Sequence, residues 1–324
     1  MTVLTRFLAQ HPAFYLPLCA LAAILADWLL GEPRRWHPLA GFGRLADMLE
    51  ARLNRPARPV VVRFLGMLAM GLAIAPAASL AFWCRQRSGL AWIVDILLCY
   101  FALGARSLLQ HGEAVRRPLA EGCLPEARRH VGYMVSRDVR GLGATGIARA
   151  GVESILENGN DAIFATLFWF VLLGGPGALL LRLVNTLDAM WGYKSACFRH
   201  FGWAAARLDD LLNWLPARLT ALTYALLGAP ARALACWITQ APAWESPNAG
   251  VVMAAGAGSL DVRLGGNAVY GTGAEKREES RPRLGCGSDP DHRHLQAAMR
   301  LVERGLWFWL ALFFLVGLCA DLCS

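Results

Sequence analysis

Long apolar segments recur from one end of the chain to the other, and they limit its possible folds more than any other feature. The chain has 324 residues, of which 56% are hydrophobic and only 17% are charged, whereas soluble domains carry about 25% charged residues. An apolar helix of about 20 residues is long enough to cross a bilayer. The segments that meet this requirement are about 13–30, 60–83, 90–109 and 305–322. We therefore predict an all-α polytopic membrane protein, with residues 1–324 forming one integral-membrane domain in the lipid bilayer.

Two further apolar segments are interrupted by helix-breaking residues. A GGPG sequence at 174–177 divides segment 163–184, and a GAP sequence at 228–230 divides segment 219–238. Glycine and proline interrupt helices, and non-helical backbone at membrane depth is tolerated only where protein or a water-filled cavity covers it. We therefore expect two broken or re-entrant helical segments beside the four full transmembrane helices, with polar helical loops on the cytoplasmic face.

Arginine-rich loops connect these segments and predict the orientation of the chain. Basic residues outnumber acidic ones by 32 to 24, which gives a net charge of +8. If both interrupted segments are re-entrant, one side of the membrane receives the loops 31–59, 110–160, 182–218 and 239–304. Positive loops favour the cytoplasm, so we expect a multi-pass protein of the cell (inner) membrane with a cytoplasmic active face. Arg85 and Arg87, in the short 84–89 loop, count against this orientation.

Several functional classes find no support in the sequence. No basic patch interleaved with aromatic residues indicates nucleic-acid binding, and no P-loop or zinc-protease motif is present. The nine cysteines include no CxxC pair, so we interpret them as small buried side chains rather than a disulfide or zinc framework. The polar segment 271–294 is rich in Arg, Glu, Gly and Pro, and we expect it to be a mobile loop.

An acidic stripe is predicted where a polar helix enters the apolar segment that begins at residue 162. Arg149, Glu153, Glu157 and Asp161 follow one another at a spacing of four, so a helix would place them on one face. Three carboxylates side by side repel one another and resist desolvation. Mg²⁺ would relieve the repulsion, because it binds carboxylate and amide oxygens. The alternative is a solvated, amphipathic helix end in which Arg149 is the partner of the acids.

Arg137 follows Ser136 in an SRD sequence and, like Arg149, suits a phosphate group. One guanidinium group can bind two phosphate oxygens at once. The alternative is that these arginines pair with Asp138 and Glu153.

Asp27 lies at the end of the first apolar segment, shortly before a Gly-Glu-Pro turn and His37. An ionisable group at the end of a membrane helix favours a functional role. The alternative is an ordinary helix end with tryptophans at the membrane interface and a histidine that only forms hydrogen bonds.

A further polar cluster lies between the two interrupted segments. Asn185 and Asp188 are three residues apart and can face the same ion, and Lys194 could neutralise a transferred phosphoryl group. The alternative is a capped helix start with a lysine that extends along it to the membrane surface. Asp210 follows an adjacent aspartate, and one of the two can form an oxygen pair with Asn213.

Two small-residue sequences, Asn248-Ala249-Gly250 and Gly265-Gly266 in the segment 264–271, could bring backbone amides close to a ligand. The alternative is that these glycines serve only turns.

These motifs, taken together and in order, resemble a known family. They read DWLLGEPRRWHP, SRD, RAGVESILENGNDAIFATLFW, GGPGALLLRLVNTLDAMWGY, FGWAAARLDDLLNWLPARLTAL, NAG and RLGGNAVYG. The resemblance is to the membrane-bound adenosylcobinamide-phosphate synthases of cobalamin biosynthesis, the CobD/CbiB family, from about Ala20 to the last apolar segment. The chain departs from the family in having Gly-Glu-Pro for Gly-Asp-Pro and Leu-Glu-Asn for Ala-Glu-Asn, and segment 272–294 is its least family-like part.

The resemblance implies a late step in corrin assembly. The family joins adenosylcobyric acid to (R)-1-amino-2-propanol O-phosphate, or to aminopropanol, through an amide bond, giving adenosylcobinamide phosphate. ATP and Mg²⁺ are the expected cofactors, and other late corrin-pathway membrane enzymes are expected partners. The competing hypotheses are a polytopic transporter, which would move solute without cleaving ATP, and a non-catalytic sensor on a related scaffold.

The chemistry of this reaction assigns roles to the polar positions. The expected catalytic residues are Asp27, His37, Glu157, Asp161 and Lys194. The expected substrate- and phosphate-binding residues are Arg137, Arg149, Asn158, Asn185, Arg218, Asn248, Gly265, Gly266 and Tyr270. The expected metal ligands are Glu153, Glu157, Asp161, Asp188 and Asp210.

Overall fold

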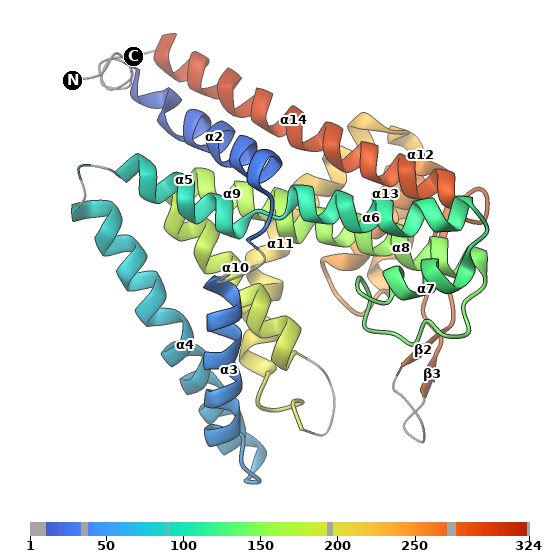
Figure 1. Cartoon of the computed structure of the whole chain (residues 1–324), viewed down its shortest axis with the longest axis horizontal. Helices are drawn as coiled ribbons and strands as arrows, with labels where there is room; N and C mark the ends of the chain where they lie inside the picture. The colour runs from blue at the N-terminus through green and yellow to red at the C-terminus, as the bar shows by residue number, and fades with distance from the viewer. Residues whose placement is uncertain are drawn as a thin grey trace. The chain divides into compact units, whose positions relative to one another are not determined.

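Helices form most of the computed structural model (Figure 1). The structure describes residues 11–33, 38–87, 89, 91–192, 197–270 and 277–322. Within these residues the chain divides into two compact units, each assembled from separated stretches. Unit 1 comprises the chain up to Gly104, Ala165–Asn213, and the chain from Leu310 onward, and unit 2 comprises Ala105–Phe164 and Trp214–Trp309.

Four stretches of helix are long and apolar enough to cross a membrane, and they confirm the four predicted spans. They are Pro12–Leu30, Pro59–Arg87, Ala91–Ala120 and His292–Leu322. The first joins a short 3-10 turn, η1 (Pro12–Phe14), to α2 (Tyr15–Leu30), and the third is divided into α5 (Ala91–Ala102) and α6 (Ala105–Ala120). The second and fourth are the helices α4 and α14. Large apolar side chains such as Leu72 and Leu315 are exposed on them, as lipid contact requires.

In unit 1, the two ends of the described chain meet. Figure 1 shows the start of α2 beside the end of α14, and His11 Nδ1 lies 2.7 Å from a carboxylate oxygen of Asp321. The unit also contains α3 (Pro38–Leu53), α9 (Ala165–Leu173), α10 (Gly175–Trp191) and the first part of α11 (Trp203–Leu227). Its core includes Trp191 and Phe201, whose rings pack edge to face with centroids 5.1 Å apart.

The predicted break in segment 163–184 lies at Gly174, between α9 and α10. Its φ of 70° is left-handed, a conformation that glycine adopts without the strain a side chain would cause. The second predicted break separates α11 from α12 (Pro230–Gln240). Both interruptions are therefore present, whereas re-entry from one side of the membrane stays a prediction.

Asp95 fixes the break at Gly174 from inside unit 1. This fully buried carboxylate accepts hydrogen bonds from the Gly175 amide at 2.7 Å, the Tyr15 hydroxyl at 2.9 Å and Arg85 Nε at 2.9 Å. Four helices, α2, α4, α5 and α10, are thereby joined by one side chain. Arg85, which counted against the predicted orientation, is neutralised by this ion pair.

In unit 2, α13 (Ala249–Leu260) is buried along nearly its whole length, because its small residues let neighbouring helices approach closely. Against it pack α8 (Ala144–Gly159), α12 and a 3-10 turn, η3 (Ala241–Ala243), while α6 and α7 (Leu124–Val131) pack against α8. A π-helical turn, η2 (Asn160–Phe164), follows α8 directly.

Four short strands, which the sequence did not predict, form the β ribbon of unit 2. In it β1 (Arg263–Gly265) pairs antiparallel with β4 (Arg283–Gly285), and β2 (Ala268–Tyr270) with β3 (Arg277–Glu279). The segment 271–294 thus differs from the expected mobile loop from residue 277 onward, because its backbone pairs with 263–270 and then enters α14. Residues 271–276 lie outside the described part of the chain.

Candidate functional site

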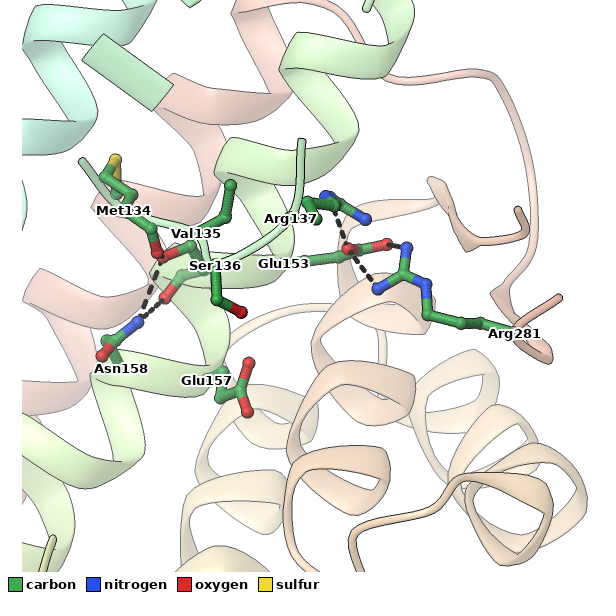
Figure 2. A pocket seen from close by; sticks show the side chains of 9 residues that line it. Met134, Val135, Ser136, Arg137, Glu153, Glu157, Asn158 and Arg281 are labelled. Carbon is green, nitrogen blue, oxygen red and sulfur yellow. Dashed lines mark hydrogen bonds and ion pairs between the residues drawn. The ribbon is translucent and has the colours of Figure 1, made fainter. Parts of the chain in front are cut away.

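A pocket of about 150 Å³ lies in unit 2, between α8, the loop that follows α7, and the β ribbon. Figure 2 shows polar side chains from all three pointing into it. The lining residues are Met134, Val135, Ser136, Arg137, Glu153, Ser154, Glu157, Asn158 and Arg281. Four of them, Arg137, Glu153, Glu157 and Asn158, were predicted site residues, and the structure brings them together.

Helix α8 supplies one wall of the pocket because its residues recur every turn. Ser154 and Asn158 lie one turn apart, and the Asn158 amide donates to the Ser154 carbonyl at 2.9 Å and hydroxyl oxygen at 3.1 Å. The Ser154 hydroxyl donates to the Met134 carbonyl at 2.9 Å. This chain of bonds fastens the loop 134–137 to the helix.

Glu153 is the most heavily bonded residue of the pocket. Its carboxylate accepts bonds from Arg137 at 2.8 Å, from Arg281 at 3.1 and 3.3 Å, and from the Gly265 amide at 2.7 Å. The carboxylate is 5% exposed, so these donors replace its hydration. Arg137 thus pairs with Glu153, one of the contacts that the sequence left open. Glu153 therefore joins loop, helix and ribbon, and its oxygens are already committed to donors.

Glu157, one turn further along α8, has no such partners. Within the described part of the chain its carboxylate forms no hydrogen bond or ion pair, and Figure 2 shows it directed into the pocket. Burial raises its pKa to about 7, and the negative charges of Asp161 and Glu153 act in the same direction, against Arg281 and Arg137. A carboxyl group with a pKa near neutrality can take up and release a proton, as a general base must.

The π-helical turn η2 alters the predicted acidic stripe beyond Glu157. The Asn160 amide bonds to the Glu157 carbonyl, three residues back. The Leu156 carbonyl instead accepts the hydroxyl of Tyr224 at 3.1 Å. Gly159 makes room for this hydroxyl, since a Cβ there would lie 2.5 Å from it. The regular spacing of four thus ends before Asp161, and such turns are frequent at functional sites.

Asp161 is held within the turn by a polar pair. The Asn160 amide donates to the Asp161 carboxylate at 2.9 Å, and the Asn160 oxygen accepts the Thr220 hydroxyl at 2.9 Å. Asp161 also lies close enough to Glu157 for its negative charge to raise the pKa of the Glu157 carboxyl group.

The predicted metal ligands do not form one cluster. No group of three or more His, Cys, Asp or Glu side chains suited to a metal ion occurs in the described ranges. Glu153 is occupied by its donors, which leaves Glu157 and Asp161 as the acidic pair of unit 2. Mg²⁺ is commonly held by one or two carboxylates together with substrate phosphates. These two carboxylates interact electrostatically, but no all-protein metal cage surrounds them in the described residues.

In unit 1, the structure assigns the oxygen cluster to Asp209 instead of the predicted Asp210. Asp209 accepts the side-chain amides of Asn213 at 3.2 Å and Asn185 at 3.5 Å. Asp210 lies 3.6 Å from Arg207 and pairs with it. Neighbouring helical residues point about 100° apart, so only one aspartate can face the asparagines. Asp188 lies on α10, partly buried.

Arg149 and Arg218, two predicted phosphate-binding residues, are engaged outside the pocket. Arg149 contacts Asp289 at 3.4 Å. Arg218 donates to the Asn248 side-chain oxygen at 2.8 Å and lies over the Trp214 ring at 4.4 Å. Asn248 is thus a partner of Arg218 in this arrangement.

The amides of Gly265 and Gly266 are already used within unit 2. Gly265 donates to Glu153, and Gly266 donates to the Arg281 carbonyl at 3.2 Å. Both amides thus have protein acceptors in this structure, and their binding of phosphate stays a prediction.

The remaining predicted residues are placed only in part. Asp27 is buried in α2 of unit 1, with 1% of its surface exposed. Tyr270 lies in β2. His37 and Lys194 lie outside the described residues.

Sequence reasoning missed Arg281, which also lies 5.3 Å from the centre of the Trp244 ring. It is separated from Glu153 by 128 residues and lies in the segment expected to be a mobile loop. Ser136 and Ser154 were also given no role, although Ser136 stands in the SRD sequence. No local spacing indicates a contact of this range, so only the abundance of arginine in 271–294 could have suggested it.

Comparison with known proteins finds relatives that share one name and match nearly the whole chain. A protein named cobalamin biosynthesis protein CobD from Chromobacterium violaceum is 56% identical over 309 residues, covering 94% of this chain and 96% of the relative. Proteins of the same name from Stutzerimonas stutzeri and Mycobacterium tuberculosis are 54% and 38% identical, covering 90% and 88% of this chain and 95% and 91% of the relatives. No solved structure matches. The family model described as CobD/Cbib protein matches residues 20–302, and the chain belongs to this family.

Proposed function

We propose that this protein is a cobalamin-biosynthesis enzyme that joins adenosylcobyric acid to (R)-1-amino-2-propanol O-phosphate, or to aminopropanol, in an ATP-dependent amide ligation. Membership of the family supports the pathway. The observation that carries the chemistry is Glu157, a carboxylate without a hydrogen-bond or ion-pair partner among the described residues, which faces a pocket beside two arginines and has a pKa raised to about 7.

Formation of an amide bond between a carboxylate and an amine requires activation of the carboxylate and removal of a proton from the attacking nitrogen. The carboxylate is a poor acyl donor, so we propose that ATP first converts it into an acyl phosphate. The amine then attacks the carbonyl carbon, the carbon–nitrogen bond forms and phosphate leaves. The attacking nitrogen must lose a proton, and Glu157 is placed to accept it.

The pocket has the size and charge of a site for the small substrate. About 150 Å³ accommodates an amino alcohol phosphate but not a corrin ring. Arg137 and Arg281 carry two positive charges against the single negative charge of Glu153. The excess positive charge suits the phosphate of the amino alcohol, while the Glu157 carboxylate suits its ammonium group.

Asp161, next to Glu157, is the residue that would hold Mg²⁺ in this proposal. When bound with nucleotide, Mg²⁺ neutralises charge on the phosphoryl oxygens during transfer. Asp161 itself is fixed by Asn160 and the π-helical turn, so its carboxylate is oriented before any ligand arrives.

The test is the product made by the purified protein in detergent. Adenosylcobyric acid, the amino alcohol phosphate, ATP and Mg²⁺ are supplied, and mass spectrometry identifies the corrinoid. We expect the mass of adenosylcobinamide phosphate, and no such product when ATP is omitted. Glu157→Gln should lower the rate ~10²–10⁴-fold, whereas Glu126→Gln, on the exposed surface of α7, should leave it unchanged.

Wild-type turnover by Glu157→Gln would remove this residue from the chemistry. Substrate that stays unmodified under all conditions would contradict the ligase itself. Movement of a solute across vesicles without ATP cleavage would favour a transporter.

A further inference from the structure

Two cysteine thiols from distant parts of unit 2 lie in contact. Cys236 is buried in α12, with 5% of its surface exposed, and Cys286 directly follows β4 and is partly exposed. Their side chains share a hydrogen bond. Both are free thiols in this structure. A buried thiol that touches a solvent-accessible thiol is the arrangement from which a disulfide can form.

The surrounding contacts hold the two thiols together. Gln240 lies one turn after Cys236 on the same face of α12. Its side chain accepts the Gly285 amide at 2.6 Å and donates to the Gly285 carbonyl at 3.1 Å. Gly285 has a left-handed φ of 77°, and a Cβ there would lie 2.1 Å from the Val262 carbonyl oxygen. The residue before Cys286 is thus fixed against α12 by two hydrogen bonds.

Asp261 completes the surroundings of Cys286. The Cys286 thiol lies 3.7 Å from a carboxylate oxygen of Asp261, whose other oxygen lies 3.3 Å from Arg232 on α12. Helix α12, the β ribbon and the end of α13 therefore meet beside Cys286. None of these residues lines the pocket of Glu157.

We propose that Cys236 and Cys286 form a thiol–disulfide site, oxidised by small-molecule disulfides, that locks the end of β4 to α12. The Cys286 thiolate attacks one sulfur of the reagent, whose sulfur–sulfur bond breaks and releases one thiol. The Cys236 sulfur then attacks the mixed disulfide on Cys286 and releases the second thiol. The two protein thiols are oxidised and the reagent disulfide is reduced, with both protons carried away on the released thiols.

The lock would act on the ribbon that supplies Arg281 to the pocket. Arg281 and Cys286 are five residues apart and flank β4. A covalent bond at Cys286 restricts the movement of this strand away from α12, and with it the departure of Arg281 from Glu153. A cross-link also restrains the unfolded chain, so the oxidised protein should be the more stable form.

The experiment uses the full-length protein in detergent and oxidised glutathione as the probe. After incubation, free thiols are alkylated, the protein is digested, and mass spectrometry identifies linked peptides. We expect a peptide pair joined through Cys236 and Cys286, which reducing agent separates, and a rise in Tm of roughly 5 °C. Cys123→Ser, which removes an exposed thiol elsewhere in unit 2, should leave both results unchanged.

Cys286→Ser and Cys236→Ala should each abolish the linked pair and the rise in Tm. If Cys286 retains glutathione while Cys236 remains open to alkylation in the wild-type protein, the proposal is overturned. The same holds if either thiol links instead to another cysteine. The readout does not depend on the ligase reaction, so the proposed function and this site succeed or fail separately.

Discussion

Two acidic groups, the fully buried Asp95 in unit 1 and the partly buried Glu157 in unit 2, have opposite surroundings. Asp95 accepts bonds from an arginine, a tyrosine and a backbone amide, and joins four helices. Glu157 lines a pocket and has no hydrogen-bond or ion-pair partner in the described residues. A buried charge with all its bonds made serves the fold, whereas one without partners is available to a ligand. Neighbouring Glu153 belongs to the first kind although it lies in the same pocket as Glu157.

The largest effect on stability is expected from Asp95→Ala. It leaves Arg85, the Gly175 amide and the Tyr15 hydroxyl without their shared acceptor. Loss of one partner from a buried pair costs ~3–5 kcal/mol, so the variant should unfold at a much lower temperature in detergent. The double variant Asp95→Leu/Arg85→Leu should recover part of the loss. If the double variant is no more stable than the single one, the buried charge is not the cause.

The next effect concerns the π-helical turn beside Glu157. Gly159→Ala places a Cβ against the Tyr224 hydroxyl and should cost ~1–3 kcal/mol through overpacking. Tyr224→Phe removes the hydroxyl and one hydrogen bond, for ~1 kcal/mol. In the double variant the clash with the hydroxyl disappears and only the close contact with Val302, at 3.0 Å, remains. The loss should therefore be smaller than the sum of the two single losses. Additive losses in thermal unfolding would contradict a shared cause.

A smaller effect should distinguish Glu157 from Asp95 by its dependence on pH. The pKa of Glu157 is raised from 4.5 to about 7, so the folded state binds its proton more tightly than the unfolded chain does. The stabilising contribution of the neutral group is full below pH ~4.5 and is lost as pH rises through ~7. Glu157→Gln should therefore be more stable than the wild type at pH 8, by ~1–2 kcal/mol, and equally stable at pH 4.

The stability of Glu157→Gln is compared with that of the wild type by measuring Tm at pH 4 and at pH 8. A destabilised Glu157→Gln at pH 8 would show that the carboxylate has a stabilising partner after all. Glu126→Gln, which lies on the surface of α7, serves as the matched control with no expected change.

The smallest effect is expected at an exposed ion pair. Arg117, in the last turn of α6, and Glu121, directly after this helix, lie 3.1 Å apart, with 76% and 59% of their side chains exposed. Such pairs contribute ~0–1 kcal/mol, so Arg117→Gln should leave Tm nearly unchanged. A loss comparable to that of Asp95→Ala would remove burial as the explanation of the difference between the two acids.

The sequence predicted those parts of the fold that depend on neighbouring residues. Apolar segments long enough to span a bilayer identified α2, α4, α5 with α6, and α14. The GGPG sequence located the break at Gly174, because glycine and proline act on their own stretch of backbone. The four-residue spacing also grouped Glu153 with Glu157 correctly, since α8 is regular up to Gly159.

The parts that could not be predicted depend on partners far away in the chain. Asp95 lies 80 residues from Gly175, and Glu153 lies 128 residues from Arg281. No spacing within a helix indicates such pairs. The π-helical turn was missed for the same reason, because the Tyr224 hydroxyl that accompanies it comes from another helix. The sequence also did not distinguish Asp209 from Asp210, because the packing of α11 decides which of the two faces the asparagines.

The triple engagement of Glu153 also bears on how the protein is made. Its carboxylate needs Arg137, which is synthesised earlier, and Arg281, which leaves the ribosome long afterwards. Until Arg281 is synthesised, the Glu153 carboxylate of the nascent chain has only some of the hydrogen-bond donors that it needs at a position that becomes buried. The pocket is therefore completed only near the end of translation, and chains released before the ribbon is made lack a finished site.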